Sequence, residues 1–166
     1  MQTFLPYKDF DKSAHALDSK RLNKQILEGY QIMNVLMNDD PKAGWRNHPA
    51  VKMWRGYENA LFDYILAMVR EADRRGIKTD KNKDNLIQLR VRTISRWGHG
   101  IPEWYQNKTI MAKVTTTHKA NLYRKDDAYY YSFKEAVISK DNEPCCEKCN
   151  YFWVTHKEIN ETAEYI

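Results

Sequence analysis

The chain has 166 residues, with 42% hydrophobic and 30% charged residues and a net charge of +5 at pH 7. This length is enough for one domain with a buried core. No stretch approaches the roughly 18 to 20 apolar residues of a membrane span, and the start MQTFLPYKDF lacks the basic and apolar regions of a secretion signal. We therefore expect a cytoplasmic protein that contacts no membrane, either associated with the nucleoid or made in an infected host cell. Six glycines and five prolines argue against a turn-rich sandwich and against disorder.

The apolar spacing predicts a first helix over residues 13–37 and a second from Pro49 to Arg74-Arg75-Gly76. Within the first, Asp18 or Ser19 offers a second helix start.

Further along, the spacing predicts a third helix over residues 81–96, a short segment opened by Pro102, and a fourth helix over residues 110–123. After Tyr131 the periodicity degrades. The sequence thus predicts an all-α, compact single-domain bundle over residues 1–133, with an irregular, acidic, cysteine-containing extension over residues 134–166 packed on it or trailing from it.

Positive charge is concentrated in residues 86–125, which hold eight basic residues against Glu103 alone. Residues 126–166 are net acidic. Aromatic residues such as Trp97 and Trp104 interrupt the basic block, and a surface that binds phosphates and stacks on bases needs both kinds of side chain. The pattern favours a nucleic acid partner, with a solvated helix face as the alternative.

Residues 17–29 (LDSKRLNKQILEG) combine bases, an amide and one carboxylate on adjoining helix faces. Lys20, Lys24 and Glu28 share one face, and Arg21, Gln25 and Glu28 share an overlapping one. Such a face can hold a phosphate and position an acid. A solvated face with a Lys24–Glu28 pair is the alternative.

Residues 44–57 (GWRNHPAVKMWRGY) place four functional side chains just before a helix N-terminus. Backbone donors there attract anions. Arg46 can bind phosphate, Trp45 can stack, and Asn47 or His48 can hydrogen-bond a base or transfer a proton. The alternative is a packed loop in which Trp45 fills the core and His48 is a cap.

These segments carry a resemblance to a known family. MQTFLPY, LDSKRLNKQ, GWRNHPAVKMWRGYENAL and HKANLYRKDDAYYY look like a bacterial and phage branch of the pyrimidine-dimer DNA glycosylases of the phage endonuclease V type. The resemblance covers about residues 1–133. It implies a compact, all-helical enzyme that binds duplex DNA on a basic face, flips a base, and cuts with its N-terminal amine.

The resemblance also implies a mechanism for this chain. An α-amine has a pKa near 7.7 to 8.0 and is partly neutral at physiological pH, so the Met1 amine attacks the sugar, expels a damaged or modified pyrimidine, and forms a Schiff base that undergoes β-elimination. Glu28 is the expected carboxylate, with Asp18 as the alternative. Arg21 and His48 complete the expected catalytic set.

Two positions depart from the family pattern. Gln2 stands where the family exposes its nucleophilic residue, and Arg21 stands where it carries its carboxylate. These departures keep two other functions open: a non-catalytic DNA-binding module on the same scaffold, and an enzyme acting on a free nucleotide or modified nucleobase.

The expected partner is double-stranded DNA, bound by a monomer. In the late helix His118, Asn121 and Lys125 share one face. The expected DNA contacts are Lys20, Lys24, Gln25, Trp45, Arg46, Asn47, Arg55, His118, Lys119, Asn121, Arg124 and Lys125.

Three cysteines lie close together at Cys145, Cys146 and Cys149, with His156 seven residues beyond. A CxxC pair with a further cysteine and a histidine offers three or four zinc ligands. Because zinc sites usually bring two such pairs, we expect reduced thiols and no cofactor, with a structural zinc as the alternative.

Overall fold

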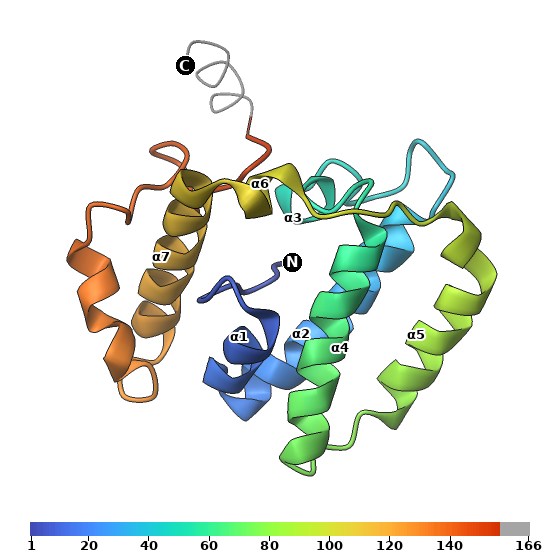
Figure 1. Ribbon diagram of the computed structural model, residues 1–166, viewed down its shortest axis with the longest axis horizontal. Helices are drawn as coiled ribbons and strands as arrows, with labels where there is room; N and C mark the ends of the chain where they lie inside the picture. Colours follow the sequence, from blue (N-terminus) through green and yellow to red (C-terminus); the bar gives the residue numbers. More distant parts are fainter. Residues whose placement is uncertain (157–166) are drawn as a thin grey trace. The chain divides into compact units, whose positions relative to one another are not determined.

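The computed structural model describes residues 1–156, and Figure 1 shows the helices of this part of the chain. Within this part of the chain all regular secondary structure is helical, which confirms the predicted all-α class. The chain divides into two compact units. The first unit is Met1–Thr3 with Asp9–Pro102, and the second is Phe4–Lys8 with the chain from Glu103 onward.

The first unit begins with two helices where the apolar spacing predicted one. Helix α1 spans Phe10–Ala16 and α2 spans Ser19–Leu36. The side chain of Asp18 accepts a hydrogen bond from the Arg21 backbone N–H at 3.0 Å and so caps α2. The cap starts a new helix, although the apolar residues continue across the break.

The predicted second helix is likewise divided, into α3 (Pro49–Lys52) and α4 (Glu58–Arg74). Between them the backbone turns at Gly56, where φ is +83°. The buried Glu58 carboxylate accepts from Gly56 N–H at 3.0 Å and from Gly98 N–H at 2.7 Å. A Cβ on Gly98 would lie 2.0 Å from the Gly56 carbonyl oxygen, so this close approach requires glycine.

Helices α2 and α4 pack against each other and form the centre of the first unit (Figure 1). Gly29 allows this packing, because a Cβ there would lie 2.5 Å from Ile65 Cγ1. At the end of α4, Arg75 bonds to Glu71 at 2.7 Å and to the His15 carbonyl at 3.0 Å, which joins α4 to α1. The Arg74 and Arg75 guanidinium groups lower the pKa of Glu71 to about 2.

The predicted third helix is α5 (Asp80–Thr93), followed by a 3₁₀ turn, η1 (Ile94–Arg96). Thr93 links the two to the buried Trp97: its hydroxyl donates to the Leu89 carbonyl at 2.7 Å and accepts from Trp97 Nε1 at 2.9 Å.

The second unit is built on α7 (Lys108–Lys125), preceded by α6 (Glu103–Gln106) and followed by the 3₁₀ helix η2 (Tyr131–Ile138). Asn107 caps α7 by accepting from Ile110 N–H at 3.0 Å. The N-terminal segment Phe4–Lys8 belongs to this unit. Its Leu5 N–H donates to His118 Nδ1 at 2.8 Å.

The segment up to residue 156 also belongs to the second unit. Asn121 Nδ2 donates to the Asn150 carbonyl at 2.6 Å, and Phe152 N–H donates to Thr117 Oγ1 at 3.2 Å. Phe152 and Val154 are buried. The predicted extension thus begins inside η2, and its later part, at Asn150 and Phe152, is fixed to α7 by hydrogen bonds. None of the described helices is long and apolar enough to cross a membrane.

Candidate active site

The first three residues are held in the first unit by buried contacts. Thr3 is fully buried, and its hydroxyl accepts from the indole N–H of Trp54 at 3.1 Å. Gln2 is 7% exposed, and its side-chain oxygen accepts from Thr3 N–H at 2.8 Å. These contacts fix the direction in which the chain reaches Met1.

The amine of Met1 lies beside the carboxylate of Glu28. The Met1 nitrogen is 4.0 Å from Glu28 Oε1, and Lys24 Nζ is 3.8 Å from the same oxygen. The other oxygen, Oε2, accepts from Gln25 Nε2 at 3.0 Å. Gln25 Oε1 in turn accepts from the hydroxyl of Tyr64 at 2.7 Å. Tyr64 and Gln25 are 0% and 1% exposed, so the carboxylate is held from the protein interior.

His48 lies close enough to the Met1 amine for the positive charge of that amine to affect the His48 ring. Burial, and then the positive charge of the N-terminus, lower the pKa of His48. Its Nδ1 accepts from Ala50 N–H at 3.1 Å, so His48 caps α3. The neutral ring that this bond requires carries its proton on Nε2.

Trp45 does not fill the core, because it is 61% exposed. Its ring centroid lies 5.5 Å from that of His48. The backbone at Trp45 has a φ of +68°, a left-handed conformation that is uncommon for a side chain of this size. The turn is closed by a 2.9 Å bond from His48 N–H to the Trp45 carbonyl. The loop thus presents an exposed indole next to His48.

Arg21 and Asp18, two of the predicted site residues, pair with each other. Arg21 Nη1 lies 2.7 Å from Asp18 Oδ2, while Asp18 Oδ1 caps α2. Glu28, two turns further along α2, is the carboxylate that lies beside the amine.

The arginines of residues 44–57 brace the loop. Arg46 Nη1 donates to the Asn38 carbonyl and Arg55 Nη2 donates to the Arg46 carbonyl, each at 2.9 Å. Asn47 and Arg55 are exposed, as are Lys20 and Lys24 on α2.

The prediction that His118 and Asn121 contact DNA disagrees with their burial. They are 2% and 8% exposed, and both hydrogen-bond to backbone within the second unit. Burial lowers the pKa of His118 to about 3, so its ring is neutral. Helical spacing placed both residues on one face correctly, but this face points inward.

Other basic residues of the late helix are accessible. Arg124 and Lys125 are exposed in the last turn of α7. The ammonium of Lys119, which is half-buried, lies 4.4 Å from the ring centroid of Tyr7.

The four metal-ligand candidates also come together in the second unit. The sulfur atoms of Cys145, Cys146 and Cys149 and a ring nitrogen of His156 all lie within 4.8 Å of one another. None of these three cysteines forms a disulfide. Burial and the neighbouring thiols raise the pKa of Cys149 to about 12.

Sequence reasoning missed Tyr64, Thr3 and Trp54, the residues that hold Glu28 and the N-terminus. Tyr64 belongs to the apolar stripe of α4 and looks like ordinary core. The one signal was chemical: a buried tyrosine hydroxyl or indole N–H needs a polar partner, yet the sequence does not say where that partner is.

An amine can act as a nucleophile, and a carboxylate beside it can transfer protons. The model of a family described as pyrimidine dimer DNA glycosylase matches residues 1–85, which include Met1, Glu28, His48 and Tyr64. The chain belongs to the pyrimidine dimer DNA glycosylase family, as its resemblance predicted, and this membership implies DNA binding. Searches of curated proteins and of solved structures each returned no match.

Proposed function

We propose that this protein excises a damaged or modified pyrimidine from double-stranded DNA and cleaves the resulting abasic site, with the Met1 amine as nucleophile. The observation that carries this proposal is the 4.0 Å separation between the Met1 nitrogen and Glu28 Oε1. Membership of the glycosylase family supports the substrate class.

The proposed reaction begins with attack of the amine lone pair on C1′ of the nucleotide. A bond forms from nitrogen to C1′, the C1′–base bond breaks, and the base leaves with a proton. Ring opening then gives a Schiff base. Removal of a C2′ proton expels the 3′ phosphate by β-elimination.

In this scheme Glu28 stabilises the positive charge that develops on the sugar and shuttles protons. Its Oε2 is fixed by Gln25, so Oε1 faces the amine in a defined orientation. The neutral His48 ring and the exposed Trp45 indole lie on the α3 side of the site, where they can contact a displaced base.

We assign the phosphate contacts to those expected DNA-contact residues that are basic and accessible. These are Lys20, Lys24, Arg46, Arg55, Lys119, Arg124 and Lys125.

Borohydride trapping tests the nucleophile. The protein is incubated with ultraviolet-irradiated and abasic-site duplexes under borohydride, and the adduct is digested and located by mass spectrometry. We expect one adduct per chain on the Met1 amine, and none after that amine is selectively acetylated. An adduct on a lysine side chain would overturn the assignment.

Replacing Glu28 with Gln tests the carboxylate. Glu28→Gln should lower the cleavage rate by at least about 100-fold, the usual size of a general acid–base contribution, and leave duplex affinity within a few-fold. Glu103→Gln is the matched control, because it makes the same chemical change at an exposed glutamate. Binding without trapping or cleavage by the unmodified protein would instead support the non-catalytic module.

A further inference from the structure

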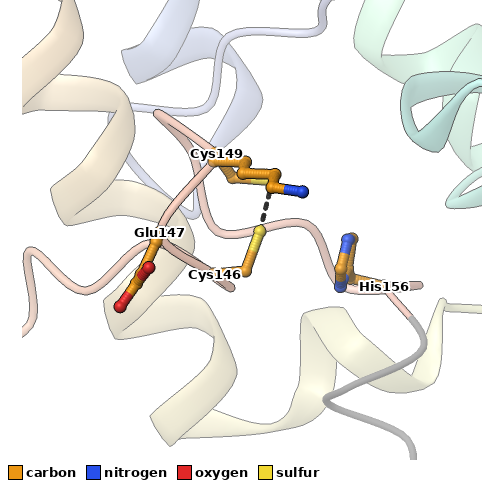
Figure 2. Close-up of a pocket in the computed structure, with 5 residues that line it drawn as sticks. Cys146, Glu147, Cys149 and His156 are labelled. Atoms are coloured by element: carbon orange, nitrogen blue, oxygen red, sulfur yellow. Dashed lines mark hydrogen bonds between the residues drawn. The ribbon is translucent and has the colours of Figure 1, made fainter.

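The cysteine cluster of the second unit has no part in the proposed reaction and lies outside the residues that match the family. Cys146, Cys149 and His156 line a hollow of about 570 Å³. The Cys146 and Cys149 sulfur atoms lie 3.2 Å apart, and a dashed line marks this contact in Figure 2. Glu147, which also lines the hollow, directs its carboxylate away from the two thiols.

The ligand atoms are close enough together for a tetrahedral site. Bonds of about 2.3 Å from zinc to sulfur place two sulfur ligands about 3.8 Å apart across a tetrahedron. The four candidate atoms lie within 4.8 Å of one another, so they reach this spacing by small side-chain rotations. The turn that presents them is regular: Cys149 N–H donates to the Cys146 carbonyl at 3.1 Å.

A second observation at the same place also favours a bound cation. The Nδ1 atom of His156 is buried and has no hydrogen-bond partner among the described residues. An unpaired buried ring nitrogen is unfavourable, and coordination to a cation would satisfy it.

We propose that Cys145, Cys146, Cys149 and His156 bind one structural zinc ion. On binding, three S–H bonds break and three Zn–S bonds form, the protons pass to solvent, and the neutral imidazole donates a nitrogen lone pair. Three thiolates and an imidazole are the donor set that suits zinc, and four protein ligands leave no open position for catalysis.

The consequence for the fold is a closed loop on α7. The cluster begins at Cys145 and ends at His156, and between these residues Asn150 and Phe152 hydrogen-bond to α7. Zinc would close this loop at both ends and hold it on the helix.

Metal analysis of the untagged protein tests the proposal. After purification with reductant and dialysis against a weak chelator, we expect one zinc per chain. Replacement by Co²⁺ should give the intense visible bands of a tetrahedral ion and near-ultraviolet thiolate charge transfer. Less than one tenth of a zinc per chain after reconstitution with Zn²⁺, or a cobalt spectrum without thiolate bands, would overturn it.

Variants separate ligands from neighbours. Cys149→Ser and His156→Ala should lower retained zinc at least tenfold, whereas Glu147→Gln, in the same hollow, and His99→Ala, an exposed histidine elsewhere, should retain it. His156→Cys should keep one metal and shift the cobalt bands toward those of a four-thiolate site. Loss of metal in His156→Cys with helical content intact would contradict the role of His156 as a ligand.

Discussion

The two oxygens of the Glu28 carboxylate have different neighbours. Oε2 is bonded to Gln25, whereas Oε1 faces the nitrogens of Met1 and Lys24. One oxygen is therefore fixed by the protein and the other is directed at the amine. The amide of Gln25 is in turn oriented by the hydroxyl of Tyr64.

Tyr64→Phe should separate this positioning role from the fold. Loss of one buried hydrogen bond is expected to lower the free energy of unfolding by about 1 kcal/mol. Because the amide of Gln25 then loses this orienting contact, borohydride trapping should slow several-fold while duplex affinity stays the same. Tyr105→Phe removes a tyrosine bond to the Lys8 carbonyl in the second unit and serves as the control. Equal trapping rates in both variants would contradict the role of Tyr64.

His118 makes stability depend on pH. Its ring accepts from Leu5 N–H, and burial lowers its pKa to about 3. Below about pH 6.5 the unfolded chain binds a proton at this residue that the folded chain does not bind until pH 3. The free energy of unfolding should therefore fall as the pH falls from about 6.5 to 3, by at most about 1.4 kcal/mol per pH unit from this group.

Denaturant titrations across this range measure the effect. His118→Asn keeps an acceptor for Leu5 but cannot titrate, so its stability should vary less with pH than that of the unmodified protein. His99→Asn, at an exposed histidine, should leave the dependence unchanged. The same pH dependence in His118→Asn and the unmodified protein would contradict this account.

At the scale of elements, the site depends on how closely α2 and α4 approach. Gln25 and Glu28 lie on α2, and Tyr64 lies on α4. Gly29 and Ile65 stand immediately beside them in sequence, and the space that a Cβ on Gly29 would take is already filled by Ile65. The close packing therefore sets the distance over which Tyr64 reaches Gln25.

Gly29→Ala should destabilise the protein by about 1 to 3 kcal/mol through overpacking, which exceeds the gain of about 1 kcal/mol in helix propensity. Combining it with Ile65→Ala removes the clashing Cγ1. In a double-mutant cycle measured by urea denaturation, the two changes together should then cost less than the sum of the single changes. Additive costs would show that this contact does not limit the packing.

The elements also show what apolar spacing can predict. Helical segments and their buried faces follow from local periodicity, and the predicted spans agree with α5 and α7. The breaks before α2 and α4 depend on polar groups instead. Asp18 is a recognisable cap, but Glu58 bonds to Gly98, forty residues away, and no local pattern reports such a contact.

At the scale of the whole molecule, the basic block of the sequence does not correspond to one unit. Arg90, Arg92 and Arg96 belong to the first unit, while Arg124 and Lys125 belong to the second. The sequence therefore predicted the sign and amount of charge, and it could not predict the division. Site residues on one helix were predictable as a group, whereas burial of His118 depends on a segment 113 residues away.

Salt dependence of duplex binding tests the assigned phosphate contacts. The logarithm of the binding constant should fall linearly with the logarithm of salt concentration. Arg124→Gln and Lys125→Gln should each reduce the steepness of this slope by about 0.9. Lys140→Gln makes the same change of charge at an exposed lysine outside the assigned set. If the slopes of the Arg124 and Lys125 variants match that of the unmodified protein, these two residues do not contact phosphates.

The bond between Leu5 and His118 also has a consequence during synthesis. Leu5 leaves the ribosome before its acceptor, which is added 113 residues later. Until then the segment Phe4–Lys8, which follows Thr3 directly in the chain, has no α7 on which to pack. The segment that adjoins the first three residues is therefore fixed only after α7 has been synthesised.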